Sequence, residues 1–116
     1  MILHLVAADE WERGAADELY VAPSLATEGF IHCTGDPQTL LAVANALYRD
    51  AEGEMVVLEV DETLLASEVR WEAAAPAPPP GVAADVRFPH VYGPIERAAV
   101  VRVRPLRRDP TGAFAD

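Results

Sequence analysis

Short stretches of the chain carry apolar residues as runs or in alternation with polar ones, and this period-two pattern is typical of β-strands. The predicted strands comprise residues 2–7, 30–33, 54–60, 68–72 and 100–106. In the last of these stretches valine alternates with arginine. We therefore expect one face of that strand to be buried and the other to be exposed.

Two segments follow a helical pattern. Asp36 and Pro37 are typical of a helix start, and residues 40, 41, 44, 47 and 48 then form one apolar face through about residue 49. Asp9 with Glu12 three positions later resembles a capping box and predicts a helix over residues 9–19. Residues 23–28 are expected to form either a turn or a single helical turn that ends at Gly29.

The remaining segments lack a regular period. Residues 73–81 contain only alanine and proline before a final glycine, which predicts an extended surface loop. Residues 88–94 contain two prolines and a glycine and are expected to be turn-rich. The order of elements predicts one α+β domain over residues 1–108, followed by a flexible C-terminal tail over residues 109–116.

Composition narrows the possible partners. The chain of 116 residues has 19 acidic and 9 basic residues and a formal net charge of −10. This balance argues against nonspecific binding to nucleic acid or to an anionic membrane. All nine basic residues are arginine, so neither a Schiff-base lysine nor a P-loop lysine is available.

The same composition predicts a cytoplasmic location. Cys33 is the only cysteine, so an internal disulfide is impossible. The N-terminus lacks the basic region of a signal peptide, and no apolar run reaches the length of a membrane span. Neither nucleic acid nor a membrane is therefore expected as a partner.

The three histidines are the strongest candidates for chemistry. His4 lies in the first predicted strand, His32 lies two residues before Thr34 on the same strand face, and His90 lies among turn-forming residues. We predict His32, His90 and Thr34 as catalytic residues, because histidine exchanges protons near neutral pH. The predicted ligand-binding residues are His4, Trp71, Phe88 and Tyr92.

Alternatives remain for several of these residues. The nearest two histidines are 28 positions apart, so no metal site is predicted, although three scattered ligands are geometrically possible. Cys33 is either a thiol nucleophile or a small core residue. Glu72 is either a site carboxylate or a solvated strand residue. Each histidine could also be a core residue that bonds to the backbone.

Two motifs resemble a known family. Glu-Gly-Phe-Ile-His-Cys-Thr (28–34) and Phe-Pro-His-Val-Tyr-Gly-Pro-Ile (88–95) look like those of the small bacterial family called domain of unknown function 952. Ile-Leu-His-Leu (2–5), Trp-Glu (71–72) and Ala-Val-Val-Arg-Val (99–103) also fit. The resemblance covers nearly the whole chain.

The resemblance implies a fold similar to that of the ADP-ribosyltransferases, with a split, twisted, mainly antiparallel sheet, short helices and a cleft. These include the NAD-dependent RNA 2′-phosphotransferase. In such folds a first-strand histidine binds the NAD ribose, which His4 matches, and His32 with Thr34 resembles a His-x-Ser/Thr motif. Transferases of this fold often carry a late glutamate, where this chain has His90 and Tyr92.

The resemblance thus suggests a cleft that binds a nucleotide-like or ADP-ribose-containing molecule, with NAD as the candidate cofactor. The alternative is a non-catalytic sensor or interaction domain for an unrelated metabolite.

Overall fold

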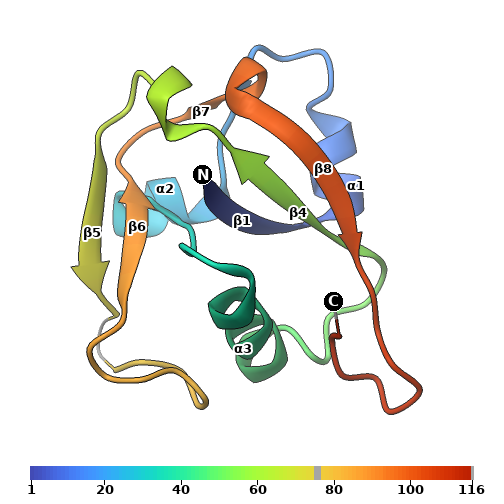
Figure 1. The fold of residues 1–116 in the computed structure, drawn as a ribbon. Helices are drawn as coiled ribbons and strands as arrows, with labels where there is room; N and C mark the ends of the chain where they lie inside the picture. The colour runs from blue at the N-terminus through green and yellow to red at the C-terminus, as the bar shows by residue number, and fades with distance from the viewer. Residues whose placement is uncertain (75–76, 116) are drawn as a thin grey trace.

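Strand β1 (Ile2–Ala7) forms an edge of a three-stranded antiparallel sheet, with β4 (Met55–Val60) in the centre and β8 (Val100–Leu106) at the other edge (Figure 1). This computed structural model describes residues 1–74 and 77–115. The register places Ile2 opposite Val60 and Ala7 opposite Met55, so the two apolar strands pair along their full length.

A second sheet contains β3 (Ile31–His32), β6 (Arg87–Val91) and β5 (Val69–Ala73), and β2 (Leu19–Tyr20) pairs with β7 (Ile95–Glu96). Every strand pairing among the described residues is antiparallel. Backbone hydrogen bonds between Leu3 and Thr34 (2.8 and 2.7 Å) join the first sheet to the second. The predicted α+β class with mainly antiparallel sheets is confirmed.

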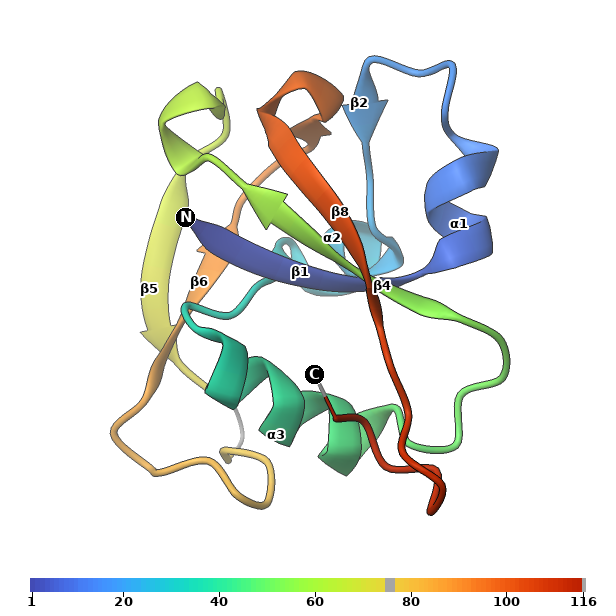
Figure 2. The same ribbon diagram turned by 45° about the vertical axis from the view of Figure 1, so that its right-hand side comes forward.

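Three short helices complete the fold: α1 (Ala8–Arg13), α2 (Pro23–Glu28) and α3 (Pro37–Leu47). Two 3₁₀ turns, η1 (Glu62–Leu64) and η2 (Arg97–Ala99), precede β5 and β8. Figure 2 shows α3 lying below the β1–β4–β8 sheet, with the C-terminal segment beside it. None of the helices in the described part of the chain is long and apolar enough to cross a membrane.

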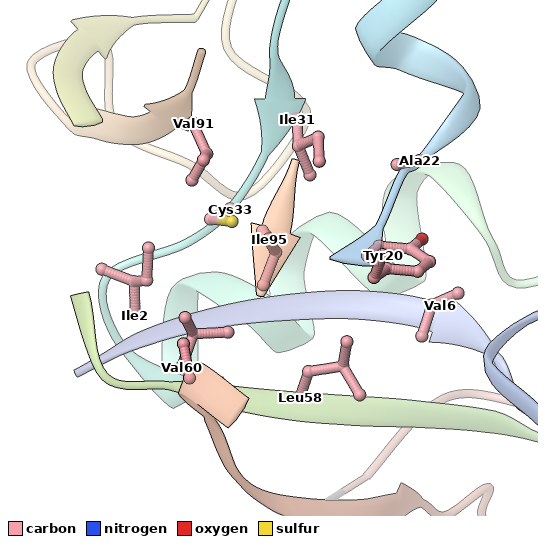
Figure 3. Close-up of a cluster of buried hydrophobic side chains, with 11 residues drawn as sticks. Ile2, Val6, Tyr20, Ala22, Ile31, Cys33, Leu58, Val60, Val91 and Ile95 are labelled. Atoms are coloured by element: carbon pink, nitrogen blue, oxygen red, sulfur yellow. The ribbon is translucent and has the colours of Figure 1, made fainter. Parts of the chain in front are cut away.

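The first sheet is covered on both faces because β1 and β4 are apolar on both. Ile2, Val6 and Leu58 belong to a cluster that faces β3, β6 and β7 (Figure 3). Leu3 and Val57, on the opposite face, belong to a second cluster with α3. This double burial explains why residues 54–60 form a nearly continuous apolar run.

Helix α3 begins as predicted. The Asp36 carboxylate accepts a hydrogen bond from the Thr39 backbone N–H (2.8 Å), and Pro37 occupies the first turn. Helix α2 also matches its prediction, because Gly29 ends it in the left-handed region at φ 87°. The helix predicted over residues 9–19 is shorter, because α1 begins at Ala8 and ends at Gly14. Glycine has low helix propensity, and a Cβ there would lie 2.8 Å from Arg97.

The prediction of a turn over residues 88–94 is wrong in its first half. Residues 87–91 form β6, the central strand of the second sheet, and Phe88 to Val91 are all buried. Pro89 is accommodated because its carbonyl accepts the Cys33 N–H (3.1 Å), and proline lacks only the donor. Pairing with neighbours on both sides thus overrides the local turn preference.

Two C-terminal predictions also differ from the structure. Val101 and Val103 in β8 are 52% and 43% exposed, whereas Val100 and Arg104 on the other face of the strand are partly buried and Leu106 is buried, so the exposed face carries valines that the alternation predicted to be buried. Residues 109–115, which lie in the predicted flexible tail, instead fold back onto α3. The buried Phe114 ring packs into the second cluster, and its backbone exchanges hydrogen bonds with the Asn45 side chain (2.7 and 3.0 Å).

Candidate functional site

One cavity of about 1030 Å³ lies against β1, β3, β6, α2 and α3, and all three histidines contribute to its lining. Ala74, Ala77 and Pro79 line it as well, so the alanine- and proline-rich loop covers part of the cavity. Small-molecule sites typically occupy roughly 300–1,000 Å³. The cavity therefore has room for a ligand of cofactor or nucleoside size.

His4 lies at the centre of a buried hydrogen-bonded chain. Its Nδ1 lies 2.7 Å from the carbonyl oxygen of His32, and its Nε2 lies 3.2 Å from the Tyr20 hydroxyl. That hydroxyl lies 2.8 Å from a carboxylate oxygen of Glu10. Burial lowers the pKa of His4, although the bond to the His32 carbonyl and the Glu10 charge oppose this effect.

The hydrogen-bonded series from the His32 carbonyl through His4 and Tyr20 to Glu10 contains few donor protons. Because a carbonyl only accepts, His4 Nδ1 donates to it, and in the neutral ring Nε2 is then an acceptor. The Tyr20 hydroxyl has one proton, which either Glu10 or His4 Nε2 receives. Burial, followed by the bond to Glu10, raises the pKa of Tyr20, so the phenol stays protonated at neutral pH. This hydrogen-bonded series consequently has one more acceptor than it has donors.

His90 has a carboxylate partner of its own. Its Nδ1 lies 2.9 Å from Glu72 Oε1, and the Tyr92 hydroxyl donates to the same oxygen. These two bonds, the Tyr92 bond foremost, hold the pKa of Glu72 below its ordinary value. The His90 ring stacks on Phe30 with a centroid distance of 4.1 Å. His90 is thereby fixed in orientation, and Nε2 is the acceptor of the neutral ring.

His32 pairs with Glu28 at the mouth of the cavity. His32 Nε2 lies 3.0 Å from a carboxylate oxygen of Glu28, and about half of each side chain is exposed. Glu28 is the last residue of α2, and Gly29 turns the chain so that β3 begins three residues later. The His32 and His90 rings lie 5.4 Å apart. Each histidine is thus coupled to a different glutamate, His4 through Tyr20 and the others directly.

Two smaller side chains complete this part of the lining. Thr34 is 5% exposed, and no described residue bonds to its buried Oγ1 atom. Burial raises the pKa of the Cys33 thiol to about 12, so the thiol is protonated at neutral pH. Cys33 is therefore a core residue, and the alternative of a thiolate nucleophile is not supported.

The family model described as "Protein of unknown function (DUF952)" matches residues 5–103. The chain belongs to the DUF952 family. This DUF952 chain is similar to the crystal structure of protein CC0527 from Caulobacter crescentus, with a TM-score of 0.76 and 23% identity over 98% of this chain and 92% of that one. The solution NMR structure of CC0527 gives a TM-score of 0.69 and 26% identity over 96% and 88%. Among curated proteins, none matches the sequence.

The DUF952 chain brings together five of the seven predicted site residues. The cavity is lined by His4, His32, Thr34, Phe88 and His90. Trp71 and Tyr92, the other two predicted ligand-binding residues, lie outside its lining. Trp71 is 46% exposed and covers Gly35, where a Cβ would lie 2.8 Å from the indole ring.

Sequence reasoning missed Glu10, Tyr20, Glu28 and Phe30, which also line the cavity of this DUF952 chain. Glu28 and Phe30 lie inside the motif that singled out His32, so that motif was a usable signal. Glu10 and Tyr20 had no comparable pattern. No group of three histidine, cysteine or acidic side chains in residues 1–74 and 77–115 is arranged to hold a metal ion.

Proposed function

We propose that the cavity binds a nucleoside-like small molecule, in which a flat ring is joined to a sugar bearing several hydroxyls. The observation that carries the proposal is that three histidines, each coupled to its own glutamate, line one cavity of about 1030 Å³ with otherwise mainly apolar walls. Apolar walls bind a ring, and a few convergent polar atoms orient the sugar. An ADP-ribose-containing ligand, suggested by the resemblance to ADP-ribosyltransferases, is the extended form of this class.

The polar groups of the lining differ in whether they already have hydrogen-bond partners within the protein. Thr34 Oγ1 and His90 Nε2 are available for sugar hydroxyls. Both ring nitrogens of His4 already have partners, so a ribose hydroxyl can bond to His4 only by replacing Tyr20. We therefore assign hydroxyl recognition first to Thr34 and His90.

The His90–Glu72 pair also suits proton transfer. A carboxylate that accepts from Nδ1 holds the imidazole in one orientation, which leaves Nε2 as the candidate general base. His32 with Glu28 provides a second acid–base pair 5.4 Å away, ring to ring. A transferase or hydrolase acting on the bound molecule would use these pairs.

A second candidate function is a non-catalytic sensor domain. It is favoured by His4, which is buried and bonded through both ring nitrogens, as a structural histidine is. Binding without conversion of the ligand would assign the chain to this class.

Isothermal titration calorimetry with adenosine, nicotinamide riboside, NAD and ADP-ribose tests the proposal. We expect saturable binding of at least one of these, and a loss of roughly tenfold in affinity in Thr34→Val and in His90→Gln. Leu64→Ala, at an exposed residue of η1, is the matched control and should bind as the wild type does. Absence of binding by all four compounds, or equal affinity in all variants, would contradict the proposal.

Chromatography of the binding compound after incubation separates the two functions. Conversion by the wild type, lost in His90→Gln, indicates an enzyme. An unchanged compound indicates a sensor. Circular dichroism of each variant checks that the fold is retained.

A further inference from the structure

We infer that the cavity selects a ligand with a positive charge and several hydrogen-bond donors, such as a nucleoside with a cationic nitrogen heterocycle. We infer also that it rejects ligands bearing phosphate, which removes ADP-ribose-containing molecules from the ligand class proposed above. The inference rests on the proposed ligand-binding function and names the ligand class. It follows from the charges around the cavity, from its hydrogen-bond balance and from one unpartnered buried hydroxyl.

The charged residues among the described lining are all acidic. They are Glu10, Glu28 and Glu52, apart from the histidines. The sequence contains no lysine, and none of its nine arginines is among the described lining residues. A phosphate in the cavity would therefore meet carboxylates without a cationic partner, whereas proteins normally bind phosphate with arginine, lysine or a helix N-terminus.

Two of these carboxylates act on the same end of the cavity. Glu10 comes from α1 and Glu28 from α2, and both are close enough to Tyr48 to raise its pKa in addition to the effect of burial. Tyr48 follows α3 and also lines the cavity. Tyr48 is 39% exposed, and its aromatic ring belongs to the same cavity lining as these two carboxylates. Such an arrangement attracts a cation, both through charge and through the ring quadrupole.

The hydrogen-bond balance favours a ligand that donates. His4 Nε2 and Glu10 share the single proton of Tyr20, which leaves one acceptor without a donor. His90 donates a hydrogen bond from Nδ1–H to Glu72, so its Nε2 is a further acceptor in the neutral ring. An acceptor that loses water without gaining a donor is unfavourable in a protein interior. Ligand hydroxyl, amide or ammonium groups would satisfy these acceptors, whereas phosphate oxygens would add more acceptors.

Thr34 provides an independent indication of a ligand. Its side chain is 95% buried, lines the cavity and has an Oγ1 atom that no described residue contacts by a hydrogen bond. Buried polar atoms in native proteins nearly always have a partner. The hydroxyl would complete its bonding with a ligand group, and it lies in the wall that includes His32 and His4.

A matched series of compounds tests the inference by isothermal titration calorimetry on the full chain. Nicotinamide riboside is a cationic nucleoside, its dihydro form is a neutral nucleoside of nearly the same shape, and nicotinamide mononucleotide adds a 5′-phosphate. N1-methylnicotinamide retains the charge but lacks the sugar. We expect the cationic riboside to bind at least roughly tenfold more tightly than the dihydro form or the mononucleotide, and its affinity to fall with added salt.

Three variants locate the selectivity. Glu10→Gln and Glu28→Gln should each reduce the preference for the cationic riboside over the dihydro form. Glu18→Gln removes an exposed carboxylate outside the cavity lining and should preserve that preference. If all three variants showed the same preference for the cationic riboside over the dihydro form, the charge selectivity would not come from Glu10 and Glu28.

The outcomes separate this inference from the proposed function. Equal binding of the riboside and its dihydro form, or tightest binding of the mononucleotide, would overturn the charge selectivity while the nucleoside site stands. Equal binding of N1-methylnicotinamide and the riboside would support the charge selectivity and overturn the nucleoside assignment. Failure of all four compounds to bind would overturn this inference, and failure of adenosine, NAD and ADP-ribose as well would overturn the proposed function.

Discussion

Among residues 1–74 and 77–115, the Tyr20 hydroxyl is the one donor shared by His4 Nε2 and Glu10, and Tyr20 is 4% exposed. Replacing Tyr20 with phenylalanine keeps the ring, which packs edge-on against Trp11 at 5.6 Å, but removes that donor. Two acceptors then lose their shared proton. We predict that Tyr20→Phe lowers the free energy of unfolding by about 1–3 kcal/mol, measured by urea denaturation.

Tyr92→Phe is the matched control for this prediction. Tyr92 also donates its hydroxyl to a glutamate, but the acceptor, Glu72, is partly exposed and can bond to water instead. The loss of stability in Tyr92→Phe should therefore be smaller. An equal or larger loss in the control would show that the buried chain at Tyr20 contributes little beyond an ordinary hydrogen bond.

At the scale of single residues, the sequence singled out the histidines as site residues but did not indicate most of the side chains that bond to them. His32 and His90 stand out because each lies in a short motif with glycine or proline nearby. Glu72 was left open between a site carboxylate and a solvated residue, and it bonds to His90 across the β5–β6 pair. Tyr20 and Glu10 approach His4 only through tertiary folding, and no local pattern of residues encodes that approach.

The C-terminal segment is the element whose role differs most from its prediction. Phe114 is 4% exposed in the cluster formed with α3 and β4, and Asn45 of α3 bonds to its backbone on both sides. We predict that Phe114→Ala lowers the free energy of unfolding by about 3–5 kcal/mol, the usual cost of truncating a buried phenylalanine. Chemical denaturation followed by tryptophan fluorescence measures the effect.

Arg107→Ala is the control within the same segment, because Arg107 is exposed and contributes its backbone carbonyl, not its side chain, to the pairing with Ala115. It should change stability by less than about 0.5 kcal/mol. If Phe114→Ala were as mild as this control, residues 109–116 would behave as the flexible tail that their composition predicts.

The elements that were predicted correctly carry local signals. Helix α3 has its own cap and one apolar face, and β4 is apolar throughout. The elements that were missed depend on distant partners. Strand β6 contains a proline and precedes a glycine turn, yet it pairs on both sides, with β3 and β5. The C-terminal segment is held by α3, more than sixty residues earlier in the chain.

At the scale of the whole molecule, one buried histidine links stability to pH. Burial lowers the pKa of His4 in the folded state below its ordinary value of 6.5. The unfolded chain therefore binds a proton near pH 6.5 that the folded chain does not bind. The contribution of His4 to stability is fully present above pH 6.5 and is lost as the pH falls through its folded pKa, by at most about 1.4 kcal/mol per pH unit.

We predict that wild-type stability falls between about pH 7 and pH 5 with a component that His4→Gln removes, because glutamine has no proton to gain in this range. Glutamine retains a donor for the His32 carbonyl, so the fold has a substitute for that bond. Urea denaturation at several pH values measures the slope in each protein. Val6→Ala, at a buried residue on the same face of β1, should lower stability at every pH but keep the wild-type slope. An unchanged slope in His4→Gln would show that His4 binds its proton equally in the folded and unfolded states, so that the bond to the His32 carbonyl and the Glu10 charge offset the effect of burial.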